Sequence, residues 1–323
     1  MSFIEFAIVC HGGPIETQAL ICLKSLFMHQ RNIHSVKVFY PRELPPISEP
    51  TKAFMERYRA EIIEFSNEFL QGITDPFSPE NKRFLVANKI WCMEGLNPNI
   101  PRIVMDCDTL VLSDITEAID SVKANIAASP TLIETLGRKY PNLFQALDIP
   151  LPRDRIRTTL TREPMPPFFS SGFVMARDAN GLFESWLEIF RKLKDRSDLI
   201  ENLYHTDEIS LALSIIREGY SYQLWPAYIN VPLGFLDYRR KMKVLHWFNL
   251  EVLRQQHALT PAFREHIARV VYSLRAEDEI DLTRAILRKH ASTWKRIGHM
   301  GREFARRAKW RIKSFKYSCS FCR

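Results

Sequence analysis

A short acidic stretch between two apolar runs constrains the fold of this chain more than any other feature. In residues 102–112, one apolar run precedes Asp106 and Asp108 and a second follows them. Apolar runs of this length predict a buried strand and its continuation. Side chains at i and i+2 of an extended chain point the same way, so we expect the two carboxylates to converge and Cys107 to point away. Two buried carboxylates are unfavourable without a positive partner, and a hard divalent cation is the simplest one.

The composition is typical of a globular protein with one large domain and some additions. Of the 323 residues, 46% are hydrophobic and 25% are charged, as in ordinary globular proteins. The sequence contains no apolar run of about 18 residues, so we expect no membrane span. The first apolar segment is interrupted by Glu5 and lacks a basic region before it, which predicts a strand and not a signal peptide. We therefore expect a cytoplasmic protein with six reduced cysteines.

Basic residues are concentrated at the carboxyl end of the chain. Residues 281–323 hold thirteen Lys or Arg and two acidic residues, a net charge of +11, whereas the whole chain carries +8. Basic and apolar residues alternate there at near-helical spacing, which predicts a basic amphipathic helix over 282–315. Such a helix binds anionic membrane surfaces; nucleic acid is the competing partner, and packing on the domain is the structural alternative. For the lone C-x-x-C of Cys319 and Cys322, palmitoylation or no role is favoured over a zinc site.

The order of the predicted elements indicates an α/β fold. The patterns predict strands at 3–9, 35–39, 168–176 and 242–246, and helices at 15–28, 81–94 and from about 205. A strand, a loop, a helix and a second strand in succession favour parallel pairing. Residues 139–167 are proline-rich and carry four arginines, which predicts a long surface insert of the kind that is often functional.

Five short motifs, in this order, resemble those of GT-A fold glycosyltransferases, and most closely glycosyltransferase family 8. They are Ala7–Gly13, Asp106-Cys-Asp108, Phe169–Gly172, Thr206-Asp207-Glu208 and Val244–His246. The resemblance implies a Rossmann-like GT-A fold, with a mixed central sheet flanked by helices, over residues 1–258. It places 139–167 on the acceptor side and leaves 259–323 as a helical, basic extension.

The resemblance also implies which residues bind the metal and the donor. Asp106, Asp108 and His246 would hold Mn²⁺, with Mg²⁺ as a substitute, because two carboxylates and an imidazole suit these ions. The expected nucleotide-sugar contacts are Cys10, His11, Gly12, Gly13, Lys89, Asp106, Cys107, Asp108, Ser171 and Gly172. The expected catalytic residues are Ser170, Asp207 and Glu208. Ser170 stands where the family usually has Asn, and Glu208 where it often has Gln.

These residues also have simpler structural interpretations. His246 can be a buried histidine at a strand end with a satisfied hydrogen bond. Asp207 and Glu208 open a predicted helix, so capping and the helix dipole can explain them. Lys89 can be a solvated lysine, and the His-Gly-Gly sequence can be a plain tight turn.

We therefore expect a metal-dependent hexosyltransferase that moves a sugar from a nucleoside-diphosphate sugar, with UDP as the expected nucleotide. The acceptor would be a glycan, a lipid-linked molecule or a protein, and the resemblance implies retention of the anomeric configuration. One alternative is a phosphohydrolase of the haloacid dehalogenase type with Asp106 as nucleophile, because Val104–Leu110 also resembles its first motif. The other is a non-catalytic protein that binds membranes or nucleic acid through its tail.

Overall fold

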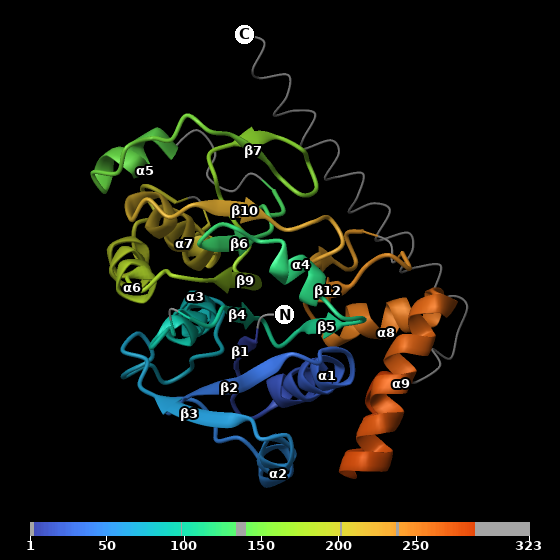
Figure 1. The fold of residues 1–323 in the computed structure, drawn as a ribbon. Coiled ribbons are helices and arrows are strands. Elements are labelled where there is room, and N and C mark those ends of the chain that lie inside the picture. Colours follow the sequence, from blue (N-terminus) through green and yellow to red (C-terminus); the bar gives the residue numbers. More distant parts are fainter. Residues whose placement is uncertain (1–2, 98, 134–139, 201, 237–238, 288–323) are drawn as a thin grey trace, which may run out of the picture. The chain divides into compact units, whose positions relative to one another are not determined.

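The computed structural model describes residues 3–97, 99–133, 140–200, 202–236 and 239–287 (Figure 1). The chain divides into two compact units. One consists of Met1–Pro232 and Arg239–Asn249, and the other of Leu233–Tyr238 and Leu250–Arg323. The predicted tail helix and the Cys319–Cys322 motif lie almost wholly in 288–323, outside the described residues. They therefore stay predictions.

A seven-stranded mixed sheet forms the centre of the first unit. Its strands, in spatial order, are β10 (Tyr222–Leu224), β6 (Ile126–Ala128), β9 (Phe173–Ala176), β4 (Arg102–Met105), β1 (Ile4–Val9), β2 (Ile33–Pro41) and β3 (Glu61–Phe65). The first four strands of the chain run parallel, whereas β9 is antiparallel to both β4 and β6. The predicted α/β class and mixed sheet are therefore confirmed. Because β1 and β4 are parallel neighbours, the loops that follow them meet at one sheet edge.

Helix α1 (Pro14–His29) connects the first two parallel strands and begins directly after the His-Gly-Gly turn. Pro14 occupies its first turn, where a missing backbone N–H costs nothing. The Glu16 side chain accepts a hydrogen bond from the Gly13 backbone N–H at 3.1 Å, which satisfies one free donor of the helix start. The middle of the helix, from Ala19 to Leu26, is buried. The predicted strand, turn, helix and strand are thus all present.

The other helices of this unit cover the sheet or follow its strands (Figure 1). They are α2 (Glu49–Arg57), α3 (Lys82–Val86), α4 (Thr116–Asp120), α5 (Tyr140–Ala146), α6 (Leu182–Leu193) and α7 (Thr206–Arg217), with 3₁₀ turns at Ala87–Met93 (η1) and Leu203–His205 (η3). Helices α6 and α7 pack against each other, and α6 also contacts η1.

The predicted helix over 81–94 is instead split into α3 and the 3₁₀ turn η1. All residues of η1 are buried. The Arg102 side chain, which is 0% exposed, donates to the carbonyl oxygens of Cys92 and Glu94, at 3.0 and 2.5 Å, and pairs with Glu5. These bonds satisfy carbonyl groups that a helix end leaves free. They anchor the end of the turn that carries Lys89.

Residues 139–167, predicted to be a surface insert, bury several apolar side chains. Besides α5 they form a small hairpin from β7 (Ile156–Arg157) and β8 (Pro164–Met165). Its apolar residues Ile156 and Met165 are buried and join the same hydrophobic core as Phe144 of α5. The four arginines are exposed. The segment therefore contributes to the core while presenting its charges to solvent.

A second, three-stranded sheet in the order β11 (Val231–Pro232), β12 (Val244–His246) and β5 (Thr109–Val111) belongs to the first unit. Strand β5 follows β4 after a short turn, so the acidic stretch links the two sheets. The second unit consists mainly of α8 (Leu250–Leu259), α9 (Pro261–Asp278) and α10 (Thr283–Ile286), with α9 contacting both others. Among the described residues, no helix combines the length and apolar character needed to span a bilayer.

Candidate active site

The two aspartates of the acidic stretch lie in a turn and not in a continuous strand. Strand β4 ends at Met105, and the Thr109 N–H donates to the Asp106 carbonyl oxygen at 3.1 Å before β5 begins. The prediction of extended chain through both residues is therefore wrong. The turn still brings both carboxylates to one side. Cys107 does point elsewhere, with its sulfur 3.5 Å from Gln18 Oε1.

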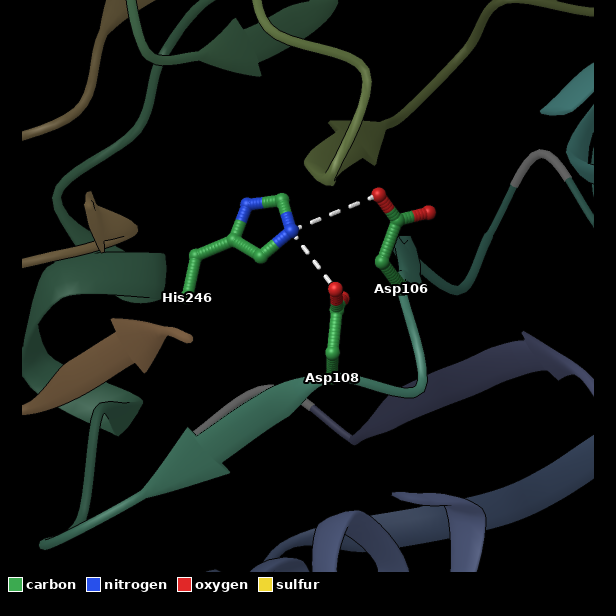
Figure 2. A group of neighbouring side chains, drawn as sticks. All are labelled: Asp106, Asp108 and His246. Atoms are coloured by element: carbon green, nitrogen blue, oxygen red, sulfur yellow. Dashed lines mark ion pairs between the residues drawn. The ribbon is translucent and has the colours of Figure 1, made fainter. Parts of the chain in front are cut away.

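His246 completes a cluster of three metal-binding residue types. It is the last residue of β12, which pairs antiparallel with β5 so that His246 lies opposite Thr109. Its Nε2 lies 3.0 Å from Asp108 Oδ1 and 3.7 Å from Asp106 Oδ2 (Figure 2). One ligand atom from each of the three residues lies within 4.8 Å of the others. The structure therefore brings together the three residues predicted as metal ligands.

Gly172 makes room for this cluster. A Cβ atom at this position would lie 2.5 Å from His246 Cε1 and 3.0 Å from Asp106 Oδ2. The Gly172 carbonyl oxygen also accepts a hydrogen bond from the Asp106 N–H at 2.9 Å. The glycine was expected to contact the nucleotide-sugar. Here its missing side chain is required by the imidazole itself.

The cluster fits a divalent cation by its donor set. Asp108 Oδ1 is buried and is paired with His246 Nε2 at 3.0 Å. Burial alone would raise the pKa of Asp108, but His246 and Lys89 lower it below its usual value. Burial likewise opposes charge on His246, yet the two aspartates raise its pKa. Two carboxylates and an imidazole at this spacing are ligands that Mn²⁺ or Mg²⁺ accepts.

Lys89 is a buried ion-pair partner and not a solvated lysine. Lys89 lies in η1 and is 8% exposed. Its Nζ lies 2.8 Å from Asp106 Oδ1 and 3.4 Å from Asp207 Oδ2. It also donates to Ser171 Oγ at 3.1 Å. Burial would lower the pKa of Lys89, but the two carboxylates hold it well above its usual value. Lys89 thus links the proposed metal ligands to the first turn of α7.

Asp207 faces this lysine instead of capping its helix. The Ser171 hydroxyl donates to Asp207 Oδ2 at 2.6 Å, and the Trp186 indole N–H donates to the Asp207 carbonyl oxygen at 3.0 Å. No side-chain cap closes the start of α7. Burial raises the pKa of Asp207 above its usual value despite the nearby Lys89. The capping interpretation therefore does not account for this side chain.

Glu208, the next residue, has a different environment. The Thr131 hydroxyl donates to Glu208 Oε2 at 3.0 Å, and His205 Nδ1 lies 3.4 Å from the same oxygen. Burial would raise the pKa of Glu208, but His205 and Thr131 lower it below its usual value. Two consecutive carboxylates thus have pKa values shifted in opposite directions. Such a separation is typical of catalytic sites.

The charged side chains described above surround one pocket. Its lining includes the predicted residues Lys89, Asp106, Asp108, Ser170, Ser171, Gly172, Asp207, Glu208 and His246. Sequence reasoning missed Thr159, Tyr204, His205, Asn230 and Phe248, which also line it. His205 could have been suspected from its position three residues before Glu208 at a helix start. The other four carry no sequence pattern that sets them apart.

Comparison with known proteins identifies the family. A sequence profile of the Rhodobacterales glycosyltransferase domain matches residues 6–219, about two thirds of the chain. The chain belongs to this family. It is therefore a glycosyltransferase, and the phosphohydrolase interpretation of Asp106 is set aside. None of the curated proteins compared with it matches.

Solved structures give the fold of this glycosyltransferase. The galactosyltransferase LgtC, in complex with donor and acceptor sugar analogues, aligns with a TM-score of 0.53 at 12% identity, covering 82% of this chain and 96% of that one. An active-site mutant of LgtC aligns with a TM-score of 0.55 at 12% identity, covering 84% and 96%. Mouse xyloside xylosyltransferase 1 aligns at 0.47 and 12% identity, covering 76% and 97%. The likeness to LgtC shows a GT-A fold.

Not all residues predicted to bind the donor line the pocket of this glycosyltransferase. Cys10, His11, Gly12 and Gly13 follow β1 but are absent from its lining, as is Cys107. A Cβ on Gly12 would lie 2.3 Å from the Pro46 carbonyl oxygen, so this glycine is required for packing against the chain itself. Nucleotide binding by these residues stays a prediction.

Proposed function

We propose that this glycosyltransferase is metal-dependent and takes its sugar from a UDP-sugar, with Mn²⁺ as the metal and Mg²⁺ as a substitute. The observation that carries the proposal is the convergence of Asp106, Asp108 and His246, whose ligand atoms lie within 4.8 Å of one another. A bound divalent ion stabilises the negative charge that develops on a diphosphate leaving group. Asp106, Asp108 and His246 would hold that ion.

Lys89 supplies fixed positive charge beside the proposed metal ligands. Because it is held by Asp106, Asp207 and Ser171, it is preorganised and needs no rearrangement when charge develops nearby. Ser171 and Asp207 extend this arrangement towards the position of the donor sugar. The residues Cys10–Gly13 would bind the nucleotide base. This is supported by their place after β1, the parallel neighbour of the strand that leads to Asp106.

The acceptor would bind on the other side, against Glu208 and residues 139–167. Thr159 of this segment lines the same pocket as Glu208, which supports that placement. An ionised Glu208 can accept a hydrogen bond from an acceptor hydroxyl, and Ser170 would contribute beside it. The acceptor would be a glycan or a lipid-linked molecule. Retention of the anomeric configuration rests on the resemblance to family 8.

Release of UDP tests the proposal directly. Purified protein is incubated with UDP-glucose, UDP-galactose or UDP-N-acetylglucosamine and Mn²⁺, and free UDP is measured. Asp108→Ala is expected to lower UDP release more than about 100-fold, because a metal ligand is lost. The matched control is Asp195→Ala, which removes an exposed carboxylate that pairs with Arg83. Equal UDP release by wild type and Asp108→Ala would show that the site does not act through a metal.

The basic tail would hold the protein on the cytoplasmic face of a membrane. Thirteen cationic residues in 281–323 support attraction to anionic lipids. Sedimentation with vesicles of phosphatidylcholine and phosphatidylserine is expected to fall to background when these residues are removed. Binding that persists without them would contradict the role of the tail.

A further inference from the structure

A short strap, residues 129–132, lies between the segment 168–170 and the hairpin of β7 and β8. On one side, the Thr131 N–H donates to the Phe168 carbonyl oxygen at 3.1 Å, and the Ser170 N–H donates to the Ser129 carbonyl oxygen at 2.9 Å. On the other side, Thr159 and Leu160 of the hairpin tip donate their N–H groups to the strap carbonyls at 2.9 Å. The strap is thus hydrogen-bonded on both edges. Its position is set by the hairpin and the segment 168–170 together.

The side chain of one strap residue, Thr131, contacts Glu208. Thr131 is 2% exposed, and its hydroxyl donates to Glu208 Oε2. His205 approaches the same oxygen. Among the described residues, neither the hydrogen bond nor the ion pair of Glu208 involves Oε1, and Glu208 lines the pocket with its side chain 18% exposed. One oxygen of the carboxylate is therefore anchored, and the other is available to a ligand.

This arrangement differs from that of Asp207, whose Oδ2 is taken by Ser171 and Lys89 within a buried network. Asp207 is tied to the side of the pocket that carries the metal-ligand cluster. Glu208 is tied through Thr131 to the strap and, through the strap, to the hairpin. A group that binds against the hairpin therefore lies next to the free oxygen of Glu208.

We propose that Thr131 is a positioning residue that, with His205, holds the Glu208 carboxylate towards the nucleophilic hydroxyl of the acceptor. This inference rests on the proposed function. It specifies the chemistry of the acceptor at this point. The atom next to Glu208 Oε1 is a hydrogen-bond donor, such as a sugar hydroxyl or water, because an anionic group would be repelled by the ionised carboxylate. Thr131 acts through Glu208 and does not itself touch the donor.

Hydrolysis of the donor tests this inference, since water then takes the place of the acceptor. The three UDP-sugars named above serve as probes with Mn²⁺, and kcat and the donor KM are measured from UDP release. Thr131→Val removes the hydroxyl at nearly constant volume. It is expected to lower kcat about tenfold while the donor KM and the affinity for UDP with Mn²⁺ stay unchanged. Thr131→Ser is expected to restore kcat to within about threefold of wild type.

Two further variants separate positioning from a structural effect. Thr116→Val in α4, away from the pocket, also removes a buried hydroxyl, one that accepts a hydrogen bond from the Gln30 side chain. It is expected to leave kcat unchanged. In a Glu208→Gln background, Thr131→Val is expected to add little, because the carboxylate it positions is gone. An equal loss in both backgrounds would overturn the inference, as would a wild-type kcat in Thr131→Val. If wild type fails to bind UDP with Mn²⁺ in calorimetry, the proposed function fails instead.

Discussion

The two walls of the pocket hold their carboxylates in different ways. On the metal-side wall, Asp106 and Asp207 share one buried cation, Lys89, and Asp108 faces His246. On the acceptor-side wall, Glu208 is held by a neutral hydroxyl and a half-buried histidine. The metal-side wall is therefore a charge network, in which Asp106 pairs with both Lys89 and His246 and so connects the two cations. The acceptor-side wall keeps one carboxylate anchored at one oxygen only.

Asp207 and Glu208 show what this difference does to chemistry. They are consecutive in α7, but side chains of consecutive helical residues point in directions about 100° apart. One consequently enters the Lys89 network and the other reaches the strap. Burial raises the pKa of Asp207, whereas His205 and Thr131 lower the pKa of Glu208 against the effect of burial. The wall that each side chain joins thus decides the direction in which its pKa is shifted.

The largest expected effect comes from removing the shared cation. Lys89→Met leaves Asp106 and Asp207 buried without a positive partner, and should lower the free energy of unfolding by about 3–5 kcal/mol. UDP release should be lost as well. The measurement is urea unfolding in metal-free buffer. Lys52→Met, which breaks an exposed ion pair with Glu49, is the control and should change stability by less than about 0.5 kcal/mol.

The same network predicts a compensating double variant. Asp207→Asn removes one of the two charges that Lys89 neutralises, so Lys89→Met should cost less in the Asp207→Asn background. Identical losses in both backgrounds would mean that the two residues are not coupled. The metal-side wall would then not be a single charge network.

A second comparison separates the roles of the two consecutive carboxylates. Glu208→Gln should lower kcat for donor hydrolysis about 100-fold with little change in the donor KM, since the oxygen not held by Thr131 and His205 would face the proposed acceptor. Asp207→Asn should instead raise the donor KM, because it loosens Lys89 and Ser171. Steady-state kinetics with the UDP-sugar that is hydrolysed fastest distinguishes them. A raised donor KM in Glu208→Gln would contradict the assignment of Glu208 to the acceptor-side wall.

A smaller effect is expected when the room beside His246 is filled. Gly172→Ala puts a Cβ within 2.5 Å of the imidazole, so the ring and Asp106 must move apart. The affinity for Mn²⁺ should fall about 10- to 100-fold, as when groups that orient metal ligands are disturbed. Calorimetric titration with Mn²⁺ measures this. Gly181→Ala is the control, because its Cβ would meet the Tyr220 hydroxyl at 3.3 Å and Glu218 Oε2 at 3.9 Å, with no atom closer.

The smallest effect concerns the pH dependence of the acceptor-side wall. Glu208 raises the pKa of His205 against the effect of burial, so their contact stabilises the fold fully below the unfolded histidine value of 6.5 and is lost as pH rises through the folded pKa. The lowered pKa of Glu208 means that the contact is also lost when pH falls through that value. The destabilisation caused by His205→Gln, measured by urea unfolding, should therefore be largest near pH 6 and fade as pH rises through the raised pKa of His205. A pH-independent difference would contradict an ionic contact. The exposed His34 offers the control variant His34→Gln.

Much of the framework could be predicted from local patterns. Alternation and apolar runs located β1, α1, β2 and β4, and the order of these elements implied parallel strands. The convergence of Asp106, Asp108 and His246 was also foreseen. The backbone conformation that brings them together was not predicted. Strand β4 ends before the aspartates, and a turn then leads into β5 of the second sheet. Periodicity describes runs of residues and says little about where a strand stops.

The sequence by itself determined the α/β class, the acidic pair and the residue types available for a metal. Only the tertiary structure decided how these groups are paired. Lys89 was indistinguishable from a surface lysine until η1 placed it between Asp106 and Asp207, and Gly172 had no visible link to His246. Thr131 carried no sequence pattern at all. The physical reason is that side-chain packing and ion pairing depend on distances between residues far apart in the chain, whereas hydrophobic periodicity reports only on neighbours.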